Sequence, residues 1–452
     1  MVRVPVNPPT HGWSLTVPPR LWRELTDHLF RDGGEHGAVI LAGLADGPRG
    51  PRLLAREVLL ARDGVDYTIG TAGHSALTAT FVRDAVIRAR NERLVYLAVH
   101  RHLGTDAVGF SRVDLASHER GYPALRQITG LPVGGIVLAD AAAAGDLWLP
   151  DGGRAALAEL VVPGGNLVRL RPRSARGGQA AAIHDRQARL FGDLGQETLG
   201  RMRVAIAGLG GVGSILVETL ARLGVGALVL IDDETVEDTN LPRLVAADPS
   251  DVNAAKVELA IRNARRANPD IDLTVLAERI ETPRAREELT RCDWIFLAAD
   301  SHAARFWVNR AVNQFHIPAT QIGVKVRVGA DGTIGQIHAV ARLLIPAGGC
   351  LWCNELIDPT ELAIDMHPDR ERDAARYVPG VPAPSVIALN GLVAMEAVDQ
   401  FMLAGTGLHH DPDDTTWTLY LPRDRTRIPQ VPRRDPACPW CSEAGQLGRG
   451  QH

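Results

Sequence analysis

A glycine-rich turn between two apolar segments limits how the second half of this chain can fold. Residues 203–207 (RVAIA) have the composition of a buried strand, and residues 213–223 have the apolar spacing of a helix. Residues 208–213 (GLGGVG), which join them, fit the pattern G-x-G-x-x-G. A second apolar run follows at 227–232. This order predicts a strand–helix–strand unit and therefore a parallel sheet.

The same turn predicts a nucleotide-binding site. Glycines let the backbone approach phosphate groups, and the start of the following helix supplies N–H donors and the positive end of the helix dipole. Asp232 lies at the end of the second predicted strand, where a carboxylate can bind ribose hydroxyls. This fingerprint alone fits a dinucleotide-dependent dehydrogenase as well as an ATP-binding protein. The glycines predicted to surround the nucleotide are Gly208, Gly210, Gly211 and Gly213.

The segment after the second strand carries a family resemblance. Residues 232–243 (DDETVEDTNLPR) resemble the D-x-[DE]-x-V…N-L-x-R signature of the ubiquitin-activating-enzyme superfamily, which includes ThiF-type adenylyltransferases. Asp185-Arg186-Gln187 resembles the R-Q motif that precedes the first strand in that family. The resemblance covers about residues 185–442. It implies a Rossmann-like, mostly parallel α/β domain over 185–445 that uses ATP and Mg²⁺ to adenylate the C-terminal glycine of a ubiquitin-like or sulfur-carrier protein.

The resemblance also implies roles for single residues. Asp232 binds the ribose with Glu234 beside it, and Asp300, which follows an apolar strand at 294–298, coordinates Mg²⁺. Arg186 reaches the γ-phosphate, in many relatives from the partner subunit of a homodimer. The residues expected to hold the phosphates are Asn240, Arg243 and Lys256.

Amino-acid composition supports the predicted role of one of these residues, Lys256. Of 49 basic residues only Lys256 and Lys325 are lysines, which codon bias towards arginine explains in general. Lysine is a compact charge with rotatable donors, which the planar guanidinium of arginine does not reproduce. Codon bias therefore does not explain why a lysine stands at the phosphate position, Lys256. No firm role follows for Lys325.

Two C-x-x-C pairs predict a structural zinc site. Four thiolates can close a tetrahedral shell around one ion, which is the arrangement of structural rather than catalytic zinc. The alternative is a pair of redox-active motifs. No cysteine lies between Asn354 and Leu421, so we expect any thioester or sulfur transfer to be made by a separate conjugating enzyme or sulfurtransferase. The predicted ligands are Cys350, Cys353, Cys438 and Cys441, whereas Cys292 is expected in the core.

The first half has a different pattern. Short apolar runs at 38–44, 94–99 and 133–138 predict strands of a mixed α/β domain over 1–165, and the periodicity of 75–92 predicts a helix. Residues 166–184 include a basic, proline- and glycine-bearing stretch and are predicted to be a linker.

A second metal site is predicted in this half. His100 and His102 alternate at a strand end and can chelate one ion, and Asp114 adds an oxygen ligand. The set resembles the JAMM (MPN) metalloprotease pattern E…H-x-H…S-x-x-D, in which Glu35 would be general base to a zinc-bound water and Ser111 would stabilise the oxyanion. Leu103 replaces the usual proline, and the gap to Ser111 is one residue longer than the common form. The alternative is a degenerate domain that only binds.

The remaining features define the class of protein. The net charge of -4 argues against a nucleic-acid arm or a membrane-binding surface, and no signal peptide or membrane span is predicted, so we expect a cytoplasmic chain. Taken together, the two halves predict a modifier-activating enzyme fused to a JAMM-like isopeptidase. The second hypothesis is a peptide or sulfur-carrier adenylyltransferase of small-molecule biosynthesis, in which the first half is only a binding scaffold. The third hypothesis is a non-catalytic scaffold. A dehydrogenase fits least, because it needs neither Arg186 nor the paired cysteines.

Overall fold

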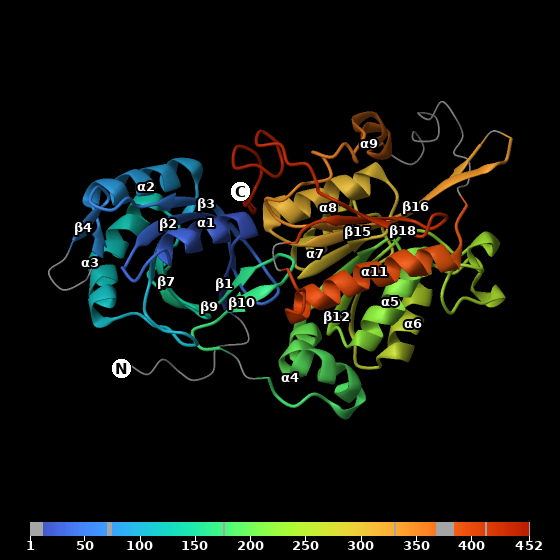
Figure 1. Ribbon diagram of the computed structural model, residues 1–452, viewed down its shortest axis with the longest axis horizontal. Coiled ribbons are helices and arrows are strands. Elements are labelled where there is room, and N and C mark those ends of the chain that lie inside the picture. The colour runs from blue at the N-terminus through green and yellow to red at the C-terminus, as the bar shows by residue number, and fades with distance from the viewer. Residues whose placement is uncertain are drawn as a thin grey trace.

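The computed structural model describes residues 12–69, 75–174, 177–329, 331–367, 384–411 and 414–451. Within these residues the chain forms two eight-stranded sheets, one in each half, and they lie side by side along the long axis of the molecule (Figure 1). The first 11 residues, where we predict no signal peptide, lie outside the described part of the chain.

The first half forms a sheet that closes into a barrel-like ring. Its strand order is β1-β3-β2-β6-β7-β8-β9-β10, and a parallel pairing of β1 with β9 closes it. The small hairpin β4-β5 lies apart from this ring. The elements are β1 Trp13–Thr16, α1 Pro19–Leu29, β2 Gly37–Ala45, β3 Arg52–Leu60, β4 Tyr67–Ile69, β5 Ser75–Leu77, α2 Ala79–Glu92, β6 Val95–Arg101, α3 Arg112–Thr129, β7 Val133–Ala139, β8 Ala142–Trp148, β9 Arg154–Val162 and β10 Val168–Leu170.

Both faces of this sheet are covered. Ile40 and Ala42 of β2 pack in the same cluster as Leu21 and Leu25 of α1. Their neighbours Val39 and Leu41 point the other way and pack with α2, because side chains alternate along a strand. The continuous apolar run of β2 is therefore explained by burial on both sides.

The second half is a twisted sheet with helices on both faces. Five parallel strands run in the order β13-β12-β11-β14-β15, and β16, β17 and β18 extend the sheet in antiparallel fashion. The elements are α4 Asp185–Arg201, β11 Arg203–Ala207, α5 Gly211–Leu223, β12 Ala227–Ile231, α6 Lys256–Ala267, β13 Asp272–Leu276, α7 Pro283–Thr290, β14 Trp294–Leu297, α8 His302–Phe315, β15 Ala319–Val328, β16 Ile334–Leu344, α9 Pro359–Asp365, α11 Ile387–Thr406, β17 Trp417–Leu421 and β18 Thr426–Gln430.

The position of β11 determines where a ligand can bind. The strand lies between β12 and β14, so the strand order reverses on either side of it. In open α/β sheets the crevice beyond the carboxyl ends of strands at such a point is the usual binding site. Helices α5, α6 and α11 cover the face of Val204 and Ile206, and α7 and α8 cover the face of Ala205 and Ala207 (Figure 1).

The predicted elements differ from the observed ones mainly at their ends. The helix predicted over 75–92 begins only at Ala79, because residues 75–77 form β5 and Thr78 caps the helix by accepting a hydrogen bond from the Phe81 N–H. The linker predicted over 166–184 contains β10, which pairs with β9. Residues 175 and 176 of that linker lie outside the described residues.

Helix α11 is long and apolar enough to cross a membrane, and it is the one helix in the described residues that meets this test. Burial of one face explains part of its apolar composition, whereas Ile387, Leu392 and Met395 are exposed. Val393, Ala397, Phe401 and Ala404 are buried in the cluster under the second sheet, where α11 packs on α5, β15 and β16.

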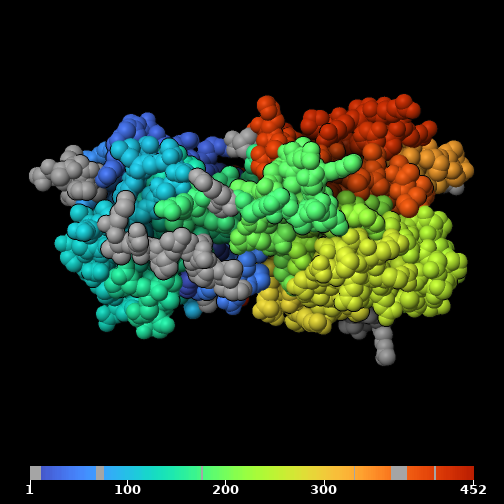
Figure 2. All heavy atoms as spheres, turned by 90° about the horizontal axis from the view of Figure 1, so that it is seen from below, coloured from blue at the N-terminus to red at the C-terminus, as the bar shows by residue number. Residues whose placement is uncertain are grey.

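Arginines join the two halves. Arg49 forms a bidentate ion pair with Asp293, and Arg52 donates to the carbonyls of Thr290 and Phe315 at 2.9 and 2.6 Å. The segment around α4, drawn in green, lies at the junction of the halves (Figure 2). The halves are therefore in direct polar contact through charged side chains.

Candidate functional site

The predicted glycine turn joins β11 to α5 at the carboxyl edge of the second sheet. Gly208 has φ +93°, and a Cβ there would lie 2.7 Å from the Ala299 nitrogen. A Cβ at Gly213 would lie 2.0 Å from the Gly208 carbonyl oxygen. Larger residues are excluded at both positions, because one needs a left-handed conformation and the other a close approach of helix to strand.

The turn presents backbone donors and one half-buried carboxylate. Gly210 is the N-cap of α5 and has no side chain to cap the first N–H groups, which suits them to an anionic ligand. Asp232 follows β12, and its two oxygens accept hydrogen bonds from the Leu209 N–H at 2.6 Å and the Glu234 N–H at 2.9 Å. Burial raises the pKa of Asp232, and these two donors oppose that effect.

Lys256 lies at the first turn of α6 with its side chain 9% exposed. Its ammonium group pairs with the carboxylate of Glu234, and its backbone N–H donates to the Glu234 carbonyl at 2.9 Å. Asn240 is buried in a short capped turn, where its side-chain oxygen accepts from the Glu237 N–H at 3.4 Å. The turn after β12 thus brings these predicted phosphate ligands to one edge of the sheet.

Two further side chains approach the same turn. Arg243 is one of them, since its Cδ lies 3.4 Å from where a Cβ of Gly211 would be. Asp300 is the other, because it directly follows Ala298 and Ala299, whose backbone atoms lie next to Gly208. Asp300 is exposed. The carboxyl ends of β11, β12 and β14 therefore place the predicted ribose, phosphate and magnesium ligands at one edge of the sheet.

Asn390 is a residue at the glycine turn that the sequence did not predict. It is buried on α11, and its side-chain nitrogen lies 2.2 Å from where a Cβ of Gly211 would be. It donates to the Ser385 hydroxyl at 3.1 Å. No local pattern marks this residue, because almost 180 positions separate it from the turn that it covers.

Arg186 lies elsewhere. It is exposed on α4, and its neighbour Gln187 donates to the carbonyl of Leu223 at the last turn of α5. Helix α5 begins at the glycine turn, and its 13 residues separate its two ends by about 20 Å. In one chain, therefore, Arg186 and the glycine turn lie at opposite ends of α5.

The four paired cysteines meet in one buried cluster. Sulfur–sulfur distances are 3.6 Å for Cys350 and Cys353, 3.8 Å for Cys350 and Cys438, and 3.5 Å for Cys353 and Cys441. Four thiolates at about 2.3 Å from Zn²⁺ in a tetrahedron lie about 3.8 Å apart, so the cluster has the dimensions of a closed zinc shell. Backbone N–H groups of Cys353, Asp435 and Trp440 lie 3.4 Å from its sulfurs and suit negative charge there.

A second cluster forms where β6 ends. The Nε2 atoms of His100 and His102 are 3.1 Å apart, and Asp114 oxygens lie 3.6 and 3.3 Å from them. His102 holds its other ring nitrogen 3.1 Å from the Gly109 carbonyl, which orients Nε2 towards the cluster. The ligating atoms of all three lie within 4.8 Å of one another, which is the spacing of a three-ligand metal site.

Ser111 and Asp114 also form the capping box of α3. The Ser111 hydroxyl accepts from the Asp114 N–H at 3.1 Å, and the Asp114 carboxylate accepts from the Ser111 N–H at 2.7 Å. Burial would raise the pKa of Asp114, but hydrogen bonds from His100, His102 and Ser111 outweigh it and hold that pKa well below its usual range. The S-x-x-D pattern thus has a structural role that positions the carboxylate.

Glu35 lies close to this cluster. It is exposed just before β2, where Gly37 pairs with His100. A hydrogen bond to Asp114 is the main cause that raises the pKa of His102, and the charge of Glu35 raises it further. Glu35 therefore lies on the segment that leads into the strand paired with His100.

Comparisons with known proteins concern the second half most directly. The ThiF family model matches residues 184–440, which is more than half of the chain. The SAMP-activating enzyme E1 of Haloferax volcanii is 29% identical over 268 residues, 58% of this chain and 90% of that protein. The sulfur carrier protein ThiS adenylyltransferase of Escherichia coli is 30% identical over 209 residues, 45% of this chain and 74% of that protein. The crystal structure of E. coli MccB with ATP has a TM-score of 0.45 and 23% identity, over 58% of this chain and 75% of that one.

Proposed function

The chain belongs to the ThiF family of E1-like adenylyltransferases, and we propose that it activates the C-terminal glycine carboxylate of a ubiquitin-like or sulfur-carrier protein. Two relatives carry such substrates in their names: SAMP for the archaeal enzyme and ThiS for the bacterial one. A peptide substrate, as in the MccA complexes of MccB, is the main alternative.

The gathering of polar side chains around the glycine turn carries this proposal. Backbone donors of α5 suit the phosphates, and the carboxylate of Asp232 suits the ribose hydroxyls. Lys256 and Arg243 would neutralise phosphate charge as it shifts in the transition state. Asp300 fits a Mg²⁺ ion, which prefers carboxylate oxygens and substrate phosphates.

The chemistry is a displacement at phosphorus. A carboxylate oxygen of the carrier attacks the α-phosphorus of ATP, and the bond from that phosphorus to the bridging oxygen breaks. The products are an acyl-adenylate and pyrophosphate, which leaves with the electron pair. The side chains contribute by positioning and charge neutralisation rather than by covalent chemistry.

Pyrophosphate exchange tests this function. We expect carrier-dependent ATP–pyrophosphate exchange that falls at least about a hundredfold in Lys256→Ala and Asp300→Ala, the size of loss typical for removal of a transition-state charge contact. Lys325→Ala is the matched control, since it removes the other lysine from an exposed position on β15. Exchange that survives both site variants would contradict the assignment.

For the first half we propose a zinc-dependent hydrolase that cleaves after the C-terminal glycine of the same modifier. The three gathered ligands support it, together with the charge of Glu35, which acts on His102. They would hold Zn²⁺ and leave a position for water, whose acidity zinc increases. Glu35 would take the proton of that water and pass it to the leaving amine, and Ser111 lies beside the ligands.

Metal content and cleavage separate this activity from a binding scaffold. We expect about two zinc ions per chain, one falling away in His100→Ala with His102→Ala and the other in Cys350→Ser with Cys353→Ser. Cleavage of a modifier fusion should be lost in Glu35→Gln while zinc content is unchanged. One zinc per chain and no cleavage would identify the first half as a binding domain.

A further inference from the structure

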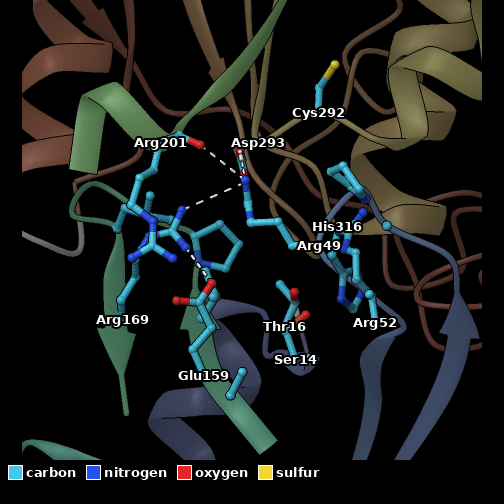
Figure 3. Close-up of a pocket in the computed structure, with 18 of the residues that line it drawn as sticks. Ser14, Thr16, Arg49, Arg52, Glu159, Arg169, Arg201, Cys292, Asp293 and His316 are labelled. Carbon is cyan, nitrogen blue, oxygen red and sulfur yellow. Dashed lines mark hydrogen bonds and ion pairs between the residues drawn. The ribbon is translucent and has the colours of Figure 1, made fainter. Parts of the chain in front are cut away.

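A pocket lies at the seam between the two halves, away from both sites above. Its volume is about 150 Å³, and cavities of about this volume admit a ligand the size of benzene. Arg169 and Glu159 stand on one side, Arg52 and His316 on the other, and Arg49 and Asp293 between them (Figure 3). Both halves contribute walls, because Glu159 belongs to β9 whereas Asp293 directly precedes β14.

The inner wall carries an excess of positive charge. Arg49 pairs with Asp293, and Arg169 pairs with Glu159 at 2.7 Å. Two other arginines of the wall, Arg52 and Arg171, have no carboxylate of their own among the described residues: Arg171 shares Glu159 at 3.4 Å, and Arg52 reaches only backbone carbonyls. Two more arginines of the lining, Arg201 and Arg291, pair with Glu197 and Glu287 outside the pocket. The other four guanidinium groups therefore face two carboxylates.

The charge of Arg52 is costly where it lies. Burial lowers the pKa of Arg52 to about 10, although the charge of Asp293 partly offsets that effect. A buried charge without a counter-ion is destabilising unless a partner neutralises it. The described residues offer this side chain two carbonyls but no ion pair, so an anion from solution would supply its counter-charge.

His316 points to the same conclusion. It lines the pocket at the end of α8 with 2% of its surface exposed, and its ring reaches the backbone of Thr16, which leaves one ring nitrogen without a hydrogen-bond partner among the described residues. Buried polar atoms are rarely left unpaired. A ligand with oxygen atoms would accept a hydrogen bond from the neutral imidazole.

We propose that this seam pocket binds an oxyanion of two negative charges or more, of the class of inorganic phosphate and pyrophosphate. Two excess guanidinium groups match a dianion, and arginine binds phosphate oxygens through paired N–H donors. The anion would contact residues of both halves at once and so hold them in their present arrangement. Pyrophosphate is also released by adenylation, so the pocket can link product concentration to the contact between the halves.

Isothermal titration of the full chain tests the proposal. The titrants are pyrophosphate and phosphate at constant ionic strength without ATP, and the protein carries Lys256→Ala to weaken phosphate binding at the nucleotide site. One equivalent should still bind. Adding Arg171→Gln should weaken binding about tenfold or more, since one charge-assisted hydrogen bond is lost.

Two further variants make the result specific. Arg88→Gln removes an arginine on α2 that pairs with Glu57 at 2.8 Å, and neither residue lines the pocket, so binding should be unchanged. Glu159→Gln removes one of the two carboxylates and should tighten binding, which loss of folding would not do. The proposal fails if neither anion binds, if Arg88→Gln weakens binding as much as Arg171→Gln, or if Glu159→Gln weakens it.

Discussion

At Lys256 the chain keeps one of its two lysines in a nearly buried position, paired with the exposed carboxylate of Glu234. The ammonium group is therefore held at the crevice without a ligand, yet its partner can turn to solvent when phosphates arrive. A guanidinium is larger and planar, so it does not reproduce the compact charge of an ammonium group.

We expect Lys256→Arg to retain the fold but to lose about a hundredfold in exchange rate, close to the loss in Lys256→Ala. Thermal unfolding and pyrophosphate exchange measured on the same preparations separate the two effects. Activity near the wild-type level in Lys256→Arg would mean that a positive charge alone is sufficient at this position.

Asp293 is the second residue with a clear energetic role. Burial would raise the pKa of Asp293, but the charge and hydrogen bonds of Arg49 outweigh it, and the pKa lies below its ordinary value. A depressed carboxyl pKa stabilises the fold above the unfolded-state pKa and loses that contribution as pH falls through the folded-state value.

Asp293→Asn should therefore lower the free energy of unfolding by roughly 2–3 kcal/mol at pH 7, because Arg49 keeps a partly buried charge without its partner. The difference between variant and wild type should begin to shrink below about pH 4, where the carboxyl of the unfolded chain becomes protonated, and should vanish as pH falls through the lower pKa of the folded state. Urea denaturation at pH 7 and pH 3 measures both. A difference that is constant with pH would exclude the ion pair as its cause.

At the scale of elements, α3 connects the stability of a helix to the geometry of a metal cluster. Ser111 and Asp114 cap its first turn, and Asp114 also faces His100 and His102. The cap fixes the Asp114 carboxylate before any ion binds, so the same carboxylate serves both the helix cap and the ligand set.

Ser111→Ala should destabilise the chain by about 1 kcal/mol, the usual cost of an N-cap, and should weaken zinc binding by the first half. Ser111→Thr should restore both, since threonine caps helices too. Zinc titration with a chromophoric chelator and thermal unfolding give the two values. Reduced stability with unchanged zinc affinity would show that the cap does not position Asp114.

Prediction from sequence succeeded for elements whose signals are local. The unit β11–α5–β12 follows from one glycine turn, and its glycines cannot be replaced without clashes. Closure of the first sheet by β1 and β9 was not predictable, since about 140 residues separate the strands and no pattern in either one identifies its partner. Asn390 and the seam pocket were missed for the same reason.

At the scale of the whole molecule, one segment near the end of the chain contacts both the cysteine cluster and the first half. Residues after Cys441 fold back on the cluster through the Ser442 hydroxyl, which donates to the Cys438 carbonyl at 2.7 Å. They continue to the first half, where Arg56 donates to the Gly445 carbonyl at 3.1 Å and Gly450 bridges to Leu44 of β2. We call residues 442–451 the clasp.

Loss of zinc should therefore loosen the first half as well as the cluster. In Cys438→Ser with Cys441→Ser we expect faster amide exchange in β2 and in the clasp, because local opening follows the loss of their anchoring contacts. Hydrogen-exchange mass spectrometry reads both segments. Cys292→Ser is the control, a buried cysteine outside the cluster, and unchanged exchange in β2 of the double variant would contradict the coupling.

The location of Arg186 leads to a prediction about assembly. It lies at the far end of α5 from the glycine turn of its own chain, so we predict that it serves a nucleotide in another copy. A closed twofold dimer would supply each crevice with the partner's arginine. Arg186→Ala and Lys256→Ala proteins should each be inactive alone. Mixed after dissociation and reassociation, they should regain up to about a quarter of wild-type exchange, since half of the dimers then hold one intact crevice of two.

The pair Lys256→Ala and Asp300→Ala provides the control for this experiment. Both residues lie at the crevice of one chain, so no mixed dimer of these variants contains a complete crevice, and mixing should restore nothing. Sedimentation of the wild-type protein should show a dimer at the assay concentration. A monomer with full activity, or Arg186→Ala with normal exchange, would mean that the γ-phosphate is held by residues of the same chain.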